Sequence, residues 1–192
     1  MRHLAFLLGI ALLVACSDRP PEQRAEGAGS ASLTASVPIP EPAPCQIEGM
    51  ENCAKTGDVL IGSQPTEAAL ETLAAQGYKT VVTTRAEGEI DWDEQAKVES
   101  LGMRFVRIPM PSPVTEISDD QVAQLDAVLS GGAGPTVLHC GSGNRVSGLW
   151  AVWLAADRGL APSEALRLAA LAGMGSVRPA VERRLGIDSI AQ

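Results

Sequence analysis

The sequence predicts an α/β domain in which a central, mostly parallel sheet of about four to five strands is flanked by helices. Short apolar runs alternate along the chain with segments of helical periodicity, which is the pattern of parallel strands joined by crossover helices. A hydrophobic fraction of 45% and a length of 192 residues are sufficient for one buried core and also leave room for tails.

The predicted elements follow one another in chain order. Four β-branched or apolar runs are expected to be strands, at residues 58–62, 80–84, 103–108 and 136–139. Helices are expected to begin near Pro65, Asp93, Asp119 and Asn144, with two more at 162–172 and 179–185. Pro65 suits the first turn of its helix, whereas Gly77 and Gly102 suit helix ends.

The first 15 residues have the pattern of a signal peptide, with Arg2, an apolar stretch at 4–14 and the small residue Ala15. Residues 13–16 read Leu-Val-Ala-Cys and resemble the bacterial lipobox, which implies cleavage before Cys16 and lipidation of its thiol. We therefore expect an exported lipoprotein that faces the periplasm and meets the membrane through its lipid anchor alone. The pattern leaves open whether that membrane is the inner or the outer one.

The segment that follows is expected to be a tether. Residues 16–44 would form a lipidated, disordered stretch, because Pro, Ala, Ser, Glu and Gly dominate it and large apolar residues are too few to repay ordering. Cys45 and Cys53 are then expected to pair in an oxidising compartment and to staple a lead-in at 45–57. A metal or redox pair is the alternative, but the two-residue spacing and nearby histidines are missing. The catalytic domain is expected at 58–192.

Charge and histidine content exclude several classes of protein. The net charge of −8 argues against binding to nucleic acid or to an anionic membrane surface, which would need clustered Lys and Arg. The chain has two histidines, His3 and His139, and His3 lies in the expected signal peptide. A histidine-rich zinc site is therefore not expected, and we predict neither a metal nor an organic cofactor.

The most informative segment is 135–150, which reads PTVLHCGSGNRVSGLW and predicts a strand, a glycine-containing loop and an apolar helix. Such a junction directs loop amides and the positive end of a helix dipole at one spot, which favours an anion. Cys140 faces these donors and is expected to be a nucleophilic thiolate. Arg145 supplies a planar fork that matches two phosphoryl oxygens. The residues expected to bind phosphate are Gly141, Ser142, Gly143, Asn144 and Arg145.

The sequence also suggests roles for two residues close to the loop. His139 precedes Cys140 on a strand, so its side chain should point to the opposite face and form a structural hydrogen bond behind the loop. Ser147 is included with Cys140 and Arg145 as a catalytic residue. Its hydroxyl could bond the Cys140 sulfur or satisfy backbone groups of the first helical turn, and both alternatives stay open.

The segment from His139 to Ser147, His-Cys-Gly-Ser-Gly-Asn-Arg-Val-Ser, resembles the signature of the protein tyrosine and dual-specificity phosphatase superfamily. In that signature five residues separate Cys from Arg, whereas four separate Cys140 from Arg145. This spacing, with Leu-Trp at 149–150, is closer to the bacterial beta-lactamase hydrolase-like protein phosphatase-like family. Further pieces at 62–65, 77–82 and 85–89 are also similar to it, and the resemblance covers roughly 58–186.

The resemblance implies a dual-specificity-phosphatase-like fold. It also implies metal-independent hydrolysis of phosphate monoesters through a phosphocysteine on Cys140, with a phosphorylated small molecule or a phosphoprotein as substrate. The short spacing resembles rhodanese sulfurtransferases as well, which would instead carry a persulfide on Cys140. A third reading is a non-catalytic, anion-binding lipoprotein of the cell envelope.

Phosphoester cleavage also needs a proton for the leaving oxygen, and a carboxyl group on a neighbouring loop usually supplies it. Two acidic groups follow predicted strands, and the sequence does not choose between them. The candidates for the general acid are Glu116, Asp119, Asp120, Glu87, Glu89 and Asp91. Asp119 and Asp120 also suit a helix N-terminus, and the second group also suits a solvated loop.

Overall fold

The computed structural model describes residues 38–187 and places a single sheet at their centre. Its strands are β1 (Ala43–Pro44), β2 (Cys53–Thr56), β3 (Val59–Gly62), β4 (Thr80–Thr83), β5 (Arg104–Arg107) and β6 (Thr136–His139). The helices of this part of the chain are α1 (Glu67–Ala75), α2 (Glu94–Ser100), α3 (Asp119–Leu129), α4 (Asn144–Ala156), α5 (Pro162–Leu171) and α6 (Arg178–Arg184).

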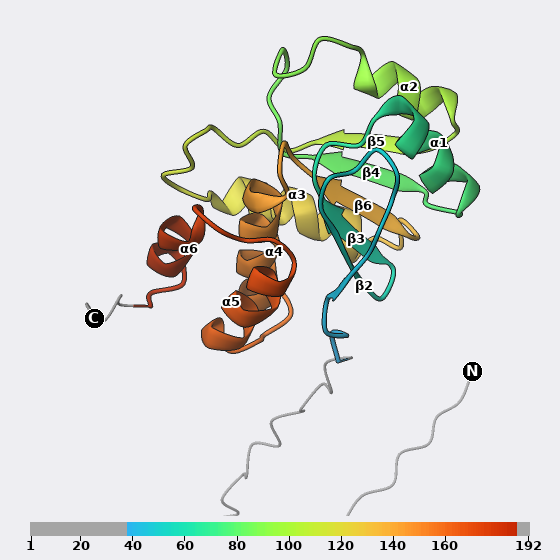
Figure 1. The fold of residues 1–192 in the computed structure, drawn as a ribbon. Coiled ribbons are helices and arrows are strands. Elements are labelled where there is room, and N and C mark those ends of the chain that lie inside the picture. The colour runs from blue at the N-terminus through green and yellow to red at the C-terminus, as the bar shows by residue number, and fades with distance from the viewer. Residues whose placement is uncertain (1–37, 188–192) are drawn as a thin grey trace, which may run out of the picture. The chain divides into compact units, whose positions relative to one another are not determined.

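The strand order β1-β2-β3-β6-β4-β5 puts β6 inside the sheet. Strands β3, β6, β4 and β5 are parallel, whereas β1 and β2 are antiparallel additions at one edge. At the carboxyl end of β6, His139 pairs with Gly62 of β3 on one side and with Thr83 of β4 on the other. The loops that follow the parallel strands therefore meet at the same edge of the sheet, around the end of β6 (Figure 1).

Helices cover both faces of the sheet, with α1 and α2 on one face and α3 to α6 on the other (Figure 1). Alternate strand residues are buried on opposite faces because successive side chains of a strand point in opposite directions. One set lies in the cluster formed with α3 to α6, namely Ile61, Val82 and Leu138. Their neighbours lie in the cluster formed with α1 and α2, namely Leu60, Val81 and Val137. Burial on both faces explains why these strands are continuous apolar runs.

The structure confirms the predicted α/β class and all four predicted strands, with bounds that differ by no more than one residue at each end. The sheet has six strands, because β1 and β2 lie in segments that were expected to be tether and lead-in. Neither strand contains an apolar run: β1 is Ala-Pro and β2 is Cys-Ala-Lys-Thr. Strand β2 pairs with β3 and β1 pairs with β2, and a search for local sequence patterns cannot detect these pairings.

The lead-in is held by a disulfide between Cys45 and Cys53, as the sequence analysis expects. Closing a loop of this size should stabilise the fold by about 2 to 3 kcal/mol in the chain-entropy description. Cys140 is the free cysteine of the described residues. The predicted signal peptide and Cys16 lie outside these residues, and no helix within 38–187 combines the length and apolar character needed to cross a bilayer.

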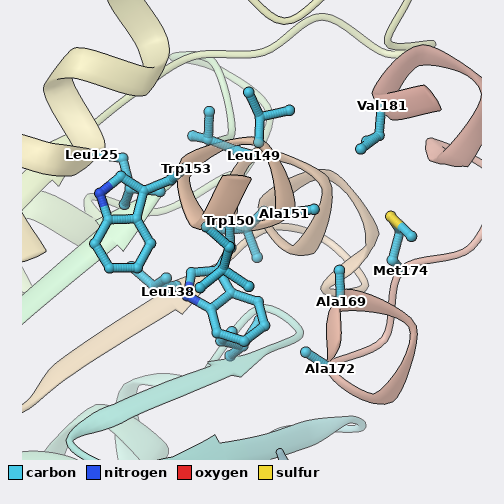
Figure 2. Packing of buried hydrophobic residues seen from close by; sticks show 14 of the residues in the cluster. Leu125, Leu138, Leu149, Trp150, Ala151, Trp153, Ala169, Ala172, Met174 and Val181 are labelled. Atoms are coloured by element: carbon cyan, nitrogen blue, oxygen red, sulfur yellow. The ribbon is translucent and has the colours of Figure 1, made fainter. Parts of the chain in front are cut away.

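Helix α4 follows directly after the Cys140 loop, and nearly all of its sides are buried. Ten consecutive residues, 145–154, are buried, including Trp150 with 1% exposure (Figure 2). Trp153 also donates from Nε1 to Asp126 Oδ1 of α3 at 3.0 Å, which joins the two helices. A helix that is apolar on all sides belongs in the centre of a core. The first turn of α4 is therefore held in a fixed position below the end of β6.

Candidate active site

Cys140 follows β6 directly and begins the loop that leads into α4. Its side chain is 1% exposed, and its Sγ accepts a hydrogen bond from the backbone N of Gly143 at 3.1 Å. Gly143 has a φ of 90° and is the residue before the first turn of α4. The left-handed backbone turns the loop back over the sulfur, which a residue with a Cβ would adopt only with strain. The structure thus gives the sulfur a backbone donor, as the sequence analysis expects.

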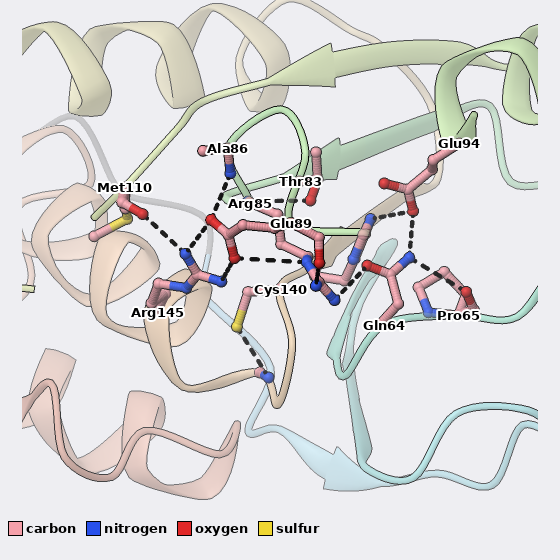
Figure 3. A network of polar contacts seen from close by, with 12 residues as sticks. Gln64, Pro65, Thr83, Arg85, Ala86, Glu89, Glu94, Met110, Cys140 and Arg145 are labelled. Atoms are coloured by element: carbon pink, nitrogen blue, oxygen red, sulfur yellow. Dashed lines mark hydrogen bonds and ion pairs between the residues drawn. The ribbon is translucent and has the colours of Figure 1, made fainter. Parts of the chain in front are cut away.

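Arg145 lies in the first turn of α4 and forms a two-pronged contact with Glu89 (Figure 3). Its Nη1 donates to Glu89 Oε1 at 2.9 Å and its Nη2 donates to Glu89 Oε2 at 2.6 Å. Nη1 also donates to the carbonyl of Met110 at 2.9 Å. These bonds use three of the five N–H groups of a guanidinium. Neither Glu89 nor Met110 uses the second fork of the planar group, Nε–H with the remaining Nη2–H, and the guanidinium also interacts with Cys140.

Glu89 is held as a carboxylate. The hydrogen bond from Arg145 is the largest cause that lowers its pKa from 4.5 to about 2, and the backbone N of Ala86 contributes by donating to Oε1 at 2.7 Å. Arg85 Nε lies 3.6 Å from Glu89 Oε2, and its Nη2 donates to the Glu89 carbonyl. The hydrogen bonds that Arg145 donates to Glu89 and, to a smaller extent, the nearby Cys140 raise the pKa of Arg145. Glu89 therefore positions Arg145 and is a poor proton donor at neutral pH.

A second set of buried polar groups lies behind the loop. His139 is fully buried, and its Nε2 lies 3.1 Å from Oε1 of Glu94, which is 2% exposed. Gln64 donates from Nε2 to the same oxygen at 2.6 Å and accepts from Arg85 Nη1 at 3.2 Å (Figure 3). Burial would raise the pKa of Glu94, but the hydrogen bonds from His139 and Gln64 outweigh it and lower the pKa. His139 thus takes the structural position that strand alternation predicts.

The side chains of Ser147 and Asn144 brace the start of α4. Ser147 Oγ is within donor distance of two carbonyls, that of Gly143 at 2.8 Å and that of Ala172 at 2.7 Å. These are the backbone contacts of the second alternative above, and a catalytic role for Ser147 stays a prediction. Asn144 accepts from the backbone N of Gly175 at 2.7 Å and donates to Ser176 Oγ at 3.0 Å. A phosphate would therefore meet the backbone of Asn144, since its side chain is engaged elsewhere.

Comparison with known proteins decides the family. A family model described as DSP-PTPase phosphatase fused to NAD+ kinase matches residues 40–183, which is well over half of the chain. The chain belongs to this DSP-PTPase family. The match contains the Cys140 loop, Glu89 and the Cys45–Cys53 disulfide.

Individual relatives agree with this family. The chain is 27% identical over 104 residues to the beta-lactamase hydrolase-like protein of Agrobacterium fabrum, covering 52% of this chain and 24% of that protein. The chain thus spans about a quarter of this curated relative. Among solved structures, Tk-PTP in the active form has a TM-score of 0.59 at 21% identity, over 70% of this chain and 94% of that one. P. aeruginosa TpbA has a TM-score of 0.54 at 21% identity, over 77% and 97%. The fold is that of dual-specificity and tyrosine phosphatases.

The other acid candidates of this DSP-PTPase domain lie on its surface. They are exposed, namely Glu116, Asp119, Asp120, Glu87 and Asp91. Asp119 forms an ion pair with Arg184, while Glu87 and Asp91 line a separate pocket of about 490 Å³. Within residues 38–187, none of the five forms a hydrogen bond or ion pair with loop 140–145, and no three His, Cys, Asp or Glu side chains gather as metal ligands would.

Sequence reasoning missed the positioning residues of the DSP-PTPase site. At the level of the sequence, Glu89 is considered as an acid or a solvated residue, Gln64 and Arg85 lie in segments that resemble the family but are given no role, and Glu94 is not considered. Three of the four do have a signal in the sequence: Gln64 comes shortly after β3, while Arg85 and Glu89 follow β4. Because parallel strands end at one edge of a sheet, residues after β3 and β4 must lie beside the loop that follows β6.

Glu89→Gln is expected to make the stability of this domain less dependent on pH in the acid range. The folded state lowers the pKa of Glu89 from 4.5 to about 2, so its stabilisation is complete above about pH 4.5 and is lost as the pH falls toward about 2. Thermal unfolding midpoints measured between about pH 6 and pH 2.5 should therefore fall less steeply in the variant than in the wild type. Glu87→Gln, an exposed neighbour, serves as the control. An unchanged slope in Glu89→Gln, or an equal change in the control, would contradict the ion pair.

Proposed function

We propose that the chain is a cysteine-dependent phosphatase that hydrolyses phosphate monoesters without a metal ion. The Cys140 thiolate attacks phosphorus, the bond from phosphorus to the leaving oxygen breaks, and a general acid protonates that oxygen. Water then attacks the phosphocysteine, which releases phosphate and restores the thiolate. The loop amides and Arg145 hold the phosphoryl oxygens in both steps.

One observation carries the proposal: the fork of Arg145 that Glu89 and Met110 do not use lies within five residues of a buried cysteine that forms no disulfide. Glu89 and Met110 accept both N–H groups of Nη1 and one of Nη2, and these bonds fix the plane of the guanidinium. A fixed fork needs no rearrangement when an oxyanion arrives, and this is how preorganised donors stabilise developing charge. A non-catalytic anion site would not need a thiol beside the donors.

The substrate class that we propose is a phosphorylated small molecule or a phosphoprotein. P. aeruginosa TpbA, which has a similar fold, has a structure in complex with pTyr. With the export and lipid anchor expected from the sequence, the protein would meet such substrates on the periplasmic side of a membrane. Nucleic acid is not proposed as a partner.

The test is a pair of assays on the full-length chain. The reduced protein should release p-nitrophenol from p-nitrophenyl phosphate in the presence of a chelator, and vanadate should inhibit it. This substrate suits the test because p-nitrophenol is acidic enough to leave as an anion, so the result depends on Cys140 and Arg145 and not on the general acid. The same preparation is offered thiosulfate and cyanide, with thiocyanate as the readout.

Each contrary outcome names another function. Thiocyanate formation that depends on Cys140, without phosphate release, would make the chain a sulfurtransferase with a Cys140 persulfide. If neither assay showed activity and the chain bound sulfate in a way that Arg145→Ala abolished, the chain would be an anion-binding module.

A further inference from the structure

A pocket of about 380 Å³ opens beside the phosphate loop. One wall is Gly141 of that loop, and a second is formed by Ser63, Gln64 and Thr66, which follow β3. The third wall contains Met50 and Glu51, from the disulfide-closed loop at 45–53. Gly141 follows Cys140 directly, so the pocket borders the start of the phosphate loop.

The wall from the disulfide-closed loop is fixed in place by hydrogen bonds. The backbone N of Ser63 donates to Asn52 O at 2.8 Å, and the backbone N of Asn52 donates to Ser63 Oγ at 3.2 Å. The backbone N of Thr66 donates to Gly49 O at 3.0 Å, and that of Gln64 donates to Gly141 O at 3.3 Å. The pocket is therefore formed before a substrate arrives, as small-molecule pockets usually are.

The pocket offers a carboxylate and hydroxyl groups. Glu51 is exposed and forms no ion pair with another described residue. Thr66 is exposed, and its side-chain oxygen accepts the backbone N–H of Ala69, which leaves its hydroxyl hydrogen free to be donated to a ligand. Ser63 is 1% exposed and accepts the backbone N–H of Asn52, so its hydroxyl mainly holds the wall. Gln64 has both ends of its amide engaged with Glu94 and Arg85, so it shapes the wall.

The lining also lacks two features. None of the described residues that form it is aromatic, and none is basic. A phosphorylated aromatic ring would find no ring to stack against, and a leaving group that carries a second phosphate would meet the Glu51 carboxylate without a compensating cation.

We propose that this pocket binds the alcohol part of the substrate and selects a hydroxyl-rich, non-aromatic alcohol such as the sugar of a sugar phosphate, with Glu51 accepting its hydroxyl hydrogens. This inference rests on the proposed function, because the alcohol is placed there by a phosphoryl group bound at Cys140 and Arg145. Glu51 acts here as a specificity residue that touches the alcohol and not the reacting atoms.

The experiment measures binding in the full-length Cys140→Ser variant, so that no turnover interferes. The probes are glucose 6-phosphate, phenyl phosphate and inorganic phosphate, and the readout is the Kd of each ester relative to that of inorganic phosphate. Glucose 6-phosphate should bind about tenfold to a hundredfold more tightly than phosphate, as expected for hydrogen bonds to a charged group. Glu51→Gln should remove most of this advantage, and the Kd values of phosphate and phenyl phosphate should change less than about twofold.

The matched control is Glu48→Gln, an exposed glutamate of the same disulfide-closed loop that does not line the pocket. It should leave all three Kd values unchanged. The inference would be overturned if glucose 6-phosphate bound no better than phosphate, if its advantage survived Glu51→Gln, or if the control removed it equally. These failures differ from failure of the proposed function, which is read from phosphate release by the unsubstituted chain.

Discussion

Replacing Cys140 by serine is expected to lower kcat for p-nitrophenyl phosphate by about a thousandfold or more, because the variant lacks the attacking atom. A serine hydroxyl stays protonated at neutral pH, and within residues 38–187 the hydrogen bond to the side chain at position 140 comes from the backbone N of Gly143 and not from a base that could activate a serine. His139 cannot do so, since its Nε2 faces Glu94 behind the loop. The measurement is single-turnover phosphate release at saturating substrate.

The same variant should keep its affinity for phosphate, because the donors of the loop do not depend on the sulfur. Arg145→Lys should weaken both binding and turnover, since an ammonium cannot hold Glu89 through two bonds and present a second fork at the same time. Residual turnover above about one per cent in Cys140→Ser, with a normal fold, would contradict the proposed mechanism.

Gly143→Ala is expected to reduce kcat/KM by about a hundredfold or more, although the substitution adds a single methyl group. Gly143 has a φ of 90°, and a Cβ built there would lie 3.3 Å from the backbone C and O of Gly62 at the end of β3. The loop must either keep this strained conformation or move away from β3. Movement would displace the backbone N that donates to Cys140 Sγ and the start of the helix that carries Arg145.

Gly141→Ala is the matched control in the same loop. A Cβ at Gly141 meets no atom within 4 Å, and its φ is not in the left-handed region. This variant should keep kcat/KM for p-nitrophenyl phosphate within a few-fold of the wild type. Equal losses in the two variants would show that the loop tolerates no side chain at all, and equal retention would show that the closeness of Gly143 to Gly62 has no part in catalysis.

The sequence was sufficient to predict the strand, the loop and the helix that hold Cys140, Gly143 and Arg145, because these residues lie within six consecutive positions that also carry the strand-to-helix signal. The role of Cys140 as nucleophile stays a prediction. The sequence was equally sufficient for the apolar strands that are buried on both faces. Contacts between distant segments were beyond it. Arg145 meets Glu89 across 56 residues of chain, and the position of Glu89 after β4 places it near the loop without pairing it with Arg145. Strand β2 pairs with β3, and β1 pairs with β2, although neither short strand has an apolar pattern of its own.

Within residues 38–187 no further strand pairs with the outer edges of β1 and β5, and this affects how copies of the chain meet. An unpaired strand edge can template the addition of a strand from another molecule. At one edge β1 is two residues long and ends at Pro44, which has no N–H to offer. At the other edge β5 begins and ends with arginine, Arg104 and Arg107, so that an approaching copy would bring like charges together. Copies of the chain at high local concentration, as the lipid anchor predicted from the sequence would produce, should thereby be protected against aggregation by strand addition.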